Sequence, residues 1–145
     1  MIHYQKILCP IDYSDCSMNA LAYAEKLAIK DSAVLYLMHV HEEHTSDYGG
    51  LKFDAELNRT AETDAEIEQK LRSSIPEEIR HRINVEILMR AGVPFEEILK
   101  AARDVGVDLI VMGTHGRTGI SHMFIGSVTE NVIRNAPCPV LCIRG

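Results

Sequence analysis

The sequence predicts an α/β fold in which one doubly wound, five-stranded parallel sheet carries helices on both faces. Short apolar runs of strand length alternate along the chain with segments of helical periodicity. Parallel neighbours need crossover connections, and the crossover helices must cover both faces of the sheet. No internal repeat or linker interrupts the alternation, so we expect one domain that spans residues 1–145.

The first half of the chain predicts two strands and two helices. An apolar run at 6–12 ends in an acid, and the polar side chains at 13–15 suit the start of a helix at 16–30. A continuous apolar run at 33–40 predicts a strand that is covered on both faces. A polar stretch at 41–51 comes next, and a charged helix is expected at 53–73, with apolar positions at Phe53, Leu57, Ala61, Ile67 and Leu71.

The second half predicts three strands, at 82–89, 107–113 and 140–143, and two helices, at 94–105 and 127–135. The helix at 94–105 has proline in its first turn, and Pro137 and Pro139 separate the last helix from the last strand. Ligands of such sheets bind beyond the carboxyl ends of the strands, where the strand order reverses. The loops after the first and fourth strands are therefore the places to look.

Composition and charge restrict the class of function. The net charge of −6, without a clustered basic face, excludes nucleic acid and anionic membranes as expected partners. No apolar stretch reaches the ~18 residues of a membrane span, and no signal-peptide pattern opens the chain, so we expect a cytoplasmic protein. The cysteines form no CxxC pair, which favours reduced, buried thiols over a zinc site: Cys9, Cys16, Cys138 and Cys142.

The loop between the fourth strand and the last helix carries the strongest functional signal. Gly113 and Gly116 allow the backbone to approach an anion, and Gly126 with Ser127 opens a helix whose free N–H groups suit a phosphate. The alternative is that the glycines serve turns and that Ser127 is only a cap. Neither GxxxxGK[ST] nor a GxGxxG after the first strand is present, which excludes a P-loop enzyme and a Rossmann dehydrogenase.

The chain resembles the ATP-binding universal stress protein family at this loop. The spacing Gly113-x2-Gly116-x9-Gly126-Ser127 matches the family pattern at every defined position. The similarity runs from KILCPIDYSDCS through LMHV to GSVTENVIRNAPCPVLCIR. The resemblance implies the strand order 3-2-1-4-5, which puts the first and fourth strands side by side.

The resemblance also implies an adenine nucleotide site for ATP, ADP or AMP, with Mg²⁺ or Mn²⁺ held through the phosphates. Asp12 would accept hydrogen bonds from the ribose or the base, although a helix-capping acid is an alternative at this position. Val40 would offer its backbone to the adenine edge. Pro10 and Ile11 would lie beside the adenosine, and the phosphates would be lined by Met112, Gly113, Gly116, Arg117, Gly126, Ser127, Val128 and Thr129.

Histidines and the last strand give weaker signals. His39, His41 and His44 have a spacing that can hold a metal, but a solvated polar loop looks the same, and we expect no metal there. His115 and His122 lie near the glycine loop without a visible paired base and nucleophile.

The last strand is apolar and lies at the edge of the predicted sheet, where unpaired backbone groups would be exposed. Members of the family commonly pair through this strand, so we expect a homodimer through Val140, Leu141, Cys142 and Ile143.

These observations favour an ATP-binding stress-response protein that acts as a nucleotide-dependent sensor or regulator. A slow ATPase or phosphotransfer enzyme is the first alternative; it is less favoured because only Asp12, Arg117 and hydroxyls are evident near the loop to serve phosphoryl transfer. A nucleotide-free interaction module is the second. A phospho-receiver domain is excluded because the third strand ends Leu88-Met89-Arg90 without an aspartate.

Overall fold

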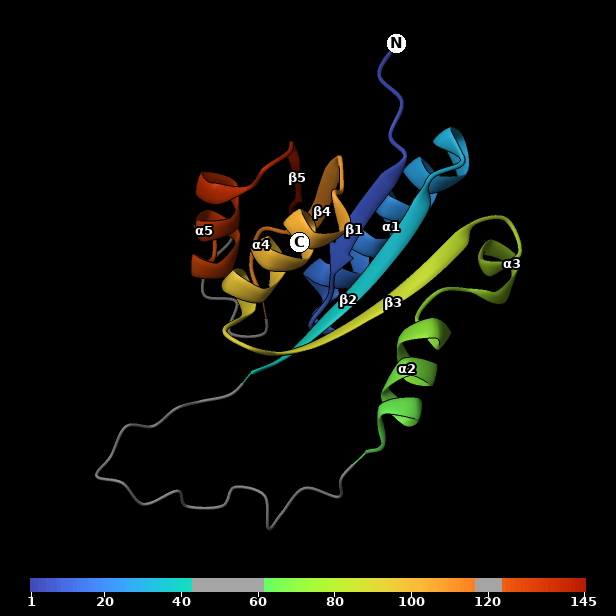
Figure 1. Cartoon of the computed structure of the whole chain (residues 1–145), viewed down its shortest axis with the longest axis horizontal. Helices are drawn as coiled ribbons and strands as arrows, with labels where there is room; N and C mark the ends of the chain where they lie inside the picture. Colours follow the sequence, from blue (N-terminus) through green and yellow to red (C-terminus); the bar gives the residue numbers. More distant parts are fainter. Residues whose placement is uncertain (43–61, 117–123) are drawn as a thin grey trace.

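The computed structural model describes residues 1–42, 62–116 and 124–145. Its sheet has the order β3-β2-β1-β4-β5, and every neighbouring pair is parallel (Figure 1). This confirms the predicted fold class and strand order. The strands are β1 (Lys6–Pro10), β2 (Val34–Glu42), β3 (Asn84–Gly92), β4 (Leu109–Gly113) and β5 (Val140–Ile143).

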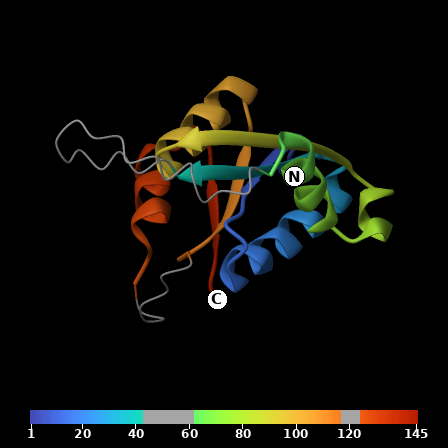
Figure 2. The ribbon, with the colours of Figure 1, turned by 90° about the horizontal axis from the view of Figure 1, so that it is seen from below.

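Helices cover both faces of the sheet. Residues of α1 and α2 pack with Ile7, Cys9 and Ile11 of the β1 segment on one face, and residues of α4 and α5 pack with Leu8 on the other. Figure 2 shows α1 and α4 on opposite sides of the strands. The helices of the described ranges are α1 (Asp15–Asp31), α2 (Asp64–Ser73), α3 (Glu77–Arg80), α4 (Pro94–Val105) and α5 (Ser127–Asn135). None of them is long and apolar enough to cross a membrane.

Several predicted boundaries need correction. The second strand continues to Glu42 and the third to Gly92, because His41 and Glu42 pair with Ala91 and Gly92. The third strand starts at Asn84 rather than at 82, β1 ends at Pro10, and β4 starts at Leu109 rather than at 107. Pairing between strands, which local composition does not report, sets these ends.

The charged helix begins later than predicted within the described chain. Thr63 caps α2, since its side chain accepts from the Glu66 N–H while the Glu66 side chain accepts from the Thr63 N–H. The predicted positions from Phe53 to Ala61 lie outside the described residues. Leu71 is fully buried and Ile67 is half-buried, as the apolar spacing predicted. The short helix α3 was not predicted.

The four cysteines are free thiols, as expected. Cys9 and Cys16 are buried, whereas Cys138 and Cys142 are only half-buried. Burial raises the pKa values of the Cys9, Cys138 and Cys142 thiols, so these side chains stay protonated near neutral pH and are weak nucleophiles.

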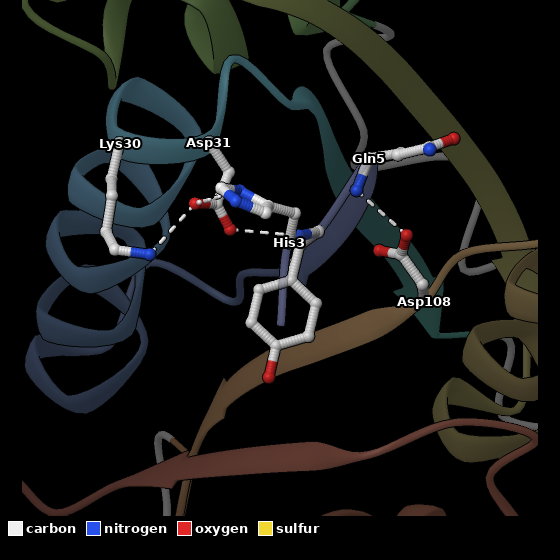
Figure 3. Close-up of polar contacts among 6 residues, drawn as sticks. His3, Gln5, Lys30, Asp31 and Asp108 are labelled. Carbon is white, nitrogen blue, oxygen red and sulfur yellow. Dashed lines mark hydrogen bonds and ion pairs between the residues drawn. The ribbon is translucent and has the colours of Figure 1, made fainter. Parts of the chain in front are cut away.

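Two carboxylates tie the amino-terminal segment to the body of the protein (Figure 3). Asp31, whose side chain is inaccessible to solvent, accepts from the Tyr4 N–H at 2.9 Å and from Lys30 Nζ at 2.9 Å. Asp108 accepts from the N–H groups of Gln5 and Lys6 at 2.8 and 3.1 Å. These contacts hold the start of β1 against the end of α1 and the start of β4. The opposite, carboxyl edge of the sheet is left for the candidate site.

Candidate functional site

The candidate site lies where β1 and β4 run side by side. The chain leaves β1 through α1 toward β2, whereas β4 pairs with the other side of β1, so the strand order reverses between them. The loops after these two strands therefore flank the same crevice, which is where ligands of doubly wound sheets bind. The described parts of these loops are 11–14, 114–116 and 124–126.

Asp12 is fixed by its own loop. Its N–H donates to Ser17 Oγ at 3.3 Å, and its Oδ1 accepts from the Ser14 N–H at 2.9 Å. Ser14 is the N-cap of α1, because its side chain accepts from the Ser17 N–H at 3.2 Å. Asp12 thus supports the cap from outside the helix, and the helix-capping alternative applies to Ser14 instead.

Two glycines let the β4 loop lie close to the β1 loop. A Cβ atom on Gly116 would be 2.5 Å from Asp12 Oδ2, and one on Gly113 would be 2.7 Å from Cys16 Sγ. Neither glycine has a positive φ. A packing role against Asp12 and Cys16 is therefore sufficient to explain both residues, and a phosphate-binding role for them stays a prediction.

The start of α5 is joined to the end of β4. The Gly126 N–H donates to the Thr114 carbonyl at 2.6 Å, and the Thr129 hydroxyl donates to the Gly113 carbonyl at 2.8 Å. Thr129 is only 3% exposed, so its hydroxyl positions the loop rather than facing a ligand. Gly126 is the N-cap without a side-chain cap bond, and Ser127 is exposed. The first N–H groups of a helix have no partner within it, which gives this helix start its capacity for an anion.

The remaining predicted site residues can offer mainly backbone groups. Pro10, Ile11 and Met112 are buried in the core, and Val40 and Val128 are half-buried against it. The Ile11 N–H is already bonded to the Met38 carbonyl at 2.8 Å. Arg117 lies outside the described residues, as do His44 and His122.

The structure brings Cys16 and Thr114 to the site, although neither was singled out for a role there, and it brings His115, which the sequence placed near the glycine loop. Cys16 Sγ donates to the Ile143 carbonyl at 3.2 Å, which also accepts from the Thr114 N–H at 3.0 Å. Thr114 Oγ1 lies 3.0 Å from His115 Nδ1. The spacing of Cys16 to Ala20 and Ala24 on the buried face of α1 was a usable signal for its inward position.

No group of three or more metal-ligating side chains is present among residues 1–42, 62–116 and 124–145. His39 Nδ1 lies 3.0 Å from the Ile11 carbonyl oxygen, so this nitrogen has a protein partner. The arrangement therefore provides one carboxylate, a glycine-lined loop and a helix start. Beside these groups, the Thr114 hydroxyl and His115 Nδ1 lie within hydrogen-bond distance of each other.

Comparison with known proteins shows the family of this chain. The family model described as the universal stress protein family matches residues 3–144. The chain belongs to the universal stress protein family. Universal stress protein MJ0577 of Methanocaldococcus jannaschii is 33% identical, over 99% of this chain and 96% of its own length. The solved universal stress protein UspA from Lactobacillus plantarum has a TM-score of 0.83 and 26% identity, and the match covers 99% of this chain and 100% of that one.

Two family structures hold nucleotides. A universal stress protein in complex with cAMP has a TM-score of 0.69 at 22% identity, and the match covers 99% of this chain and 98% of that chain. The universal stress protein from Archaeoglobus fulgidus in complex with dAMP has a TM-score of 0.62 at 24% identity, covering 99% and 100%. At these identities the matches show a shared fold.

Proposed function

We propose that this universal stress protein binds adenine nucleotides, with ATP, ADP and AMP as the candidate ligands. The observation that carries the proposal is the approach of Gly116 to Asp12 beside the start of α5. It puts a carboxylate suited to a sugar hydroxyl next to amide groups suited to phosphates. Nucleotides bound to other members of the family support the same ligand class.

Each part of the site has a role in this proposal. Asp12 accepts a hydrogen bond from the ribose, backbone groups of Val40 meet the adenine edge, and Pro10 and Ile11 lie beside the adenosine. The N–H groups of Ser127 and Val128, at the positive end of the helix dipole, receive the phosphates. Met112, Gly113, Gly116, Arg117, Gly126 and Thr129 complete the phosphate loop, and Thr129 acts through its bond to Gly113. Mg²⁺ or Mn²⁺ would bind through phosphate oxygens.

Isothermal titration with ATP, ADP and AMP, each with and without Mg²⁺, tests the proposal. Asp12→Asn keeps an oxygen that can accept from the Ser14 N–H but removes the charge, so we expect affinity to fall about 10-fold while the melting temperature changes little. Mass spectrometry of nucleotide that co-purifies with the protein identifies the species bound in cells. No heat with any of the nucleotides would contradict the proposal.

The biological role that follows is a nucleotide-dependent sensor or regulator of the stress response, in one domain that spans residues 1–145 and acts in the cytoplasm. A slow ATPase or phosphotransfer activity is the alternative at the same site, and a single-turnover assay with radiolabelled ATP separates it from binding alone. A nucleotide-free interaction module is the further alternative, and it predicts that no nucleotide co-purifies.

We also propose that the protein forms a homodimer through β5. This strand is the outer strand of the sheet, and Leu141 is 37% exposed on it. An uncovered edge strand with apolar side chains favours pairing with a second copy across a two-fold axis, through Val140, Leu141, Cys142 and Ile143. Light scattering after size exclusion should give twice the chain mass, and Leu141→Lys should give a monomer. A wild-type monomer at micromolar concentration would contradict this proposal.

A further inference from the structure

Tyr13 has an unusual backbone conformation directly beside Asp12. Its φ is 64°, in the left-handed region that bulky residues rarely adopt. Ser32 is the other described non-glycine residue with positive φ, and it occupies the C-cap of α1, where this conformation is common. A strained residue of this kind persists only where its surroundings hold it, and such residues gather at functional sites.

His39 holds Tyr13 from the side of β2. The two ring centroids are 5.2 Å apart, with the planes inclined at 48°. His39 Nδ1 also lies 3.0 Å from the Ile11 carbonyl oxygen. A carbonyl can only accept, so Nδ1 carries the hydrogen and donates it. This bond fixes the peptide group that joins Ile11 to Asp12, and so the same imidazole supports both Tyr13 and the carboxylate of the proposed site.

Lys70 holds the Tyr13 ring from α2. Its Nζ lies 4.6 Å from the ring centroid, within the range of a cation–π contact. Lys70 precedes Leu71, which is fully buried in the core, so the helix that presents Lys70 is itself anchored. A chain of contacts therefore runs from α2 through Tyr13 to the loop that carries Asp12.

We propose that Tyr13 is a positioning residue of the nucleotide site and that, through Lys70, it couples nucleotide binding to the docking of α2 on the sheet. This inference rests on the proposed nucleotide binding. Because coupling between two sites is reciprocal, bound nucleotide stabilises the docked α2, and a change in α2 alters nucleotide affinity. Helix α2 thereby becomes the element through which occupancy of the site is reported to the surface.

Lys70→Met tests the coupling because the exposed side chain keeps its length and loses its charge. Its matched control is Lys26→Met, since Lys26 Nζ lies 5.7 Å from the ring centroid of Tyr23 and both residues belong to α1. We expect Lys70→Met to weaken ATP binding about two- to fivefold. In hydrogen exchange, ATP should protect the amides of α2 in the wild type and in Lys26→Met but not in Lys70→Met.

A pair of Tyr13 variants tests the positioning role. Glycine adopts a positive φ without strain, so Tyr13→Gly removes the ring while keeping the backbone conformation accessible. We expect Tyr13→Gly to weaken ATP binding about 10-fold and Tyr13→Phe, which keeps the ring, to bind within about twofold of the wild type. If the ring has no positioning role, both variants should bind ATP with equal affinity.

The outcomes separate the inference from the function on which it rests. If the wild type binds ATP but Lys70→Met keeps either its affinity or the nucleotide-dependent protection of α2, the coupling is wrong and the nucleotide site stands. If Tyr13→Gly binds as well as Tyr13→Phe, the positioning role is wrong. If the wild type binds no adenine nucleotide, both proposals are wrong.

Discussion

The hydroxyl of Thr129 donates a hydrogen bond to the carbonyl of Gly113 over 2.8 Å, joining the first turn of α5 to the last residue of β4. Thr129 is almost fully buried, so the bond is shielded from water. The sequence placed Thr129 among the residues that line the phosphates. Its observed contact instead sets where the amide groups of the helix start lie relative to the sheet.

Thr129→Val should destabilise the protein by about 1–3 kcal/mol, because valine has the same shape but leaves the buried Gly113 carbonyl without this donor. Thr129→Ser keeps the hydroxyl and is the control, with a smaller loss from the missing methyl group. Urea denaturation of the three proteins measures the difference. Equal midpoints for Thr129→Val and the wild type would show that the bond contributes nothing.

Gly116→Ala should destabilise the loop because its Cβ atom would meet Asp12 Oδ2 at 2.5 Å. We expect a cost of about 1–3 kcal/mol, together with weaker nucleotide binding. The cost should shrink when Asp12→Ala removes the carboxylate, so the two substitutions should be non-additive in thermal unfolding. Additive effects would show that the destabilisation by Gly116→Ala does not come from contact with the Asp12 carboxylate.

Glu25→Gln should stabilise the protein at neutral pH. Burial raises the pKa of Glu25 in the folded state, so ionising it costs more there than in the unfolded chain. The stability of the wild type should therefore fall as the pH rises from the pKa of Glu25 in the unfolded chain, about 4.3, through its pKa in the folded protein. At pH 7 the variant should therefore melt at a higher temperature than the wild type.

Calorimetry of both proteins at pH 7 and below pH 4 checks this sign, because the difference should vanish at the acidic pH. Glu68→Gln is a suitable comparison, since Glu68 is 44% exposed and pairs with Arg72. A Glu25→Gln variant that is less stable than the wild type at pH 7 would contradict the assigned cause.

Asp31→Asn should destabilise the protein at neutral pH and leave it unchanged in strong acid. The hydrogen bond from the Tyr4 N–H and the contact with Lys30 hold the pKa of Asp31 below its usual range. Because the pKa of Asp31 is lowered in the folded state, its carboxylate stabilises the folded protein at pH values above its unfolded-state pKa of about 3.9. This stabilisation is lost as the pH falls through the folded-state pKa. Figure 3 shows the contact of the carboxylate with Lys30.

Thermal melts at pH 7 and near pH 2 measure this difference. Asp104→Asn is the matched control, because Asp104 is 55% exposed and lies 3.7 Å from Arg90 across the surface. The control should be nearly neutral at both pH values. If Asp31→Asn lowers the melting temperature equally at both pH values, the charge of Asp31 does not contribute to stability.

The sequence predicted the helices and strands whose residues show a clear hydrophobic period. The buried face of α1 and the proline at the start of α4 are present as expected. The four residues of α3 were missed because so short a helix has no measurable period. The ends of β2 and β3 were missed because polar His41 and Glu42 are strand residues only through their partners on β3.

In the candidate site, too, features of a single segment could be predicted and contacts between distant segments could not. The glycine spacing and Asp12 could be found in the sequence, since they mark a loop and a strand end. The reasons for the glycines could not, because they involve Cys16 and Asp12, residues about 100 positions away in the chain. The left-handed Tyr13 gave no signal either, and its ring contacts come from His39 and Lys70, which lie on two other elements.

Titration of ATP against Ser127→Pro and Ser127→Ala tests the central claim most directly. Ser127 is the first residue of α5, where proline is well tolerated, and Gly126 has φ −64° and ψ 156°, which suits a residue before proline. Proline removes the N–H at the helix start and alanine removes only the hydroxyl. The account predicts that Ser127→Pro binds ATP about 10- to 100-fold more weakly than Ser127→Ala, at similar melting temperatures. Equal affinity of the two variants would contradict it.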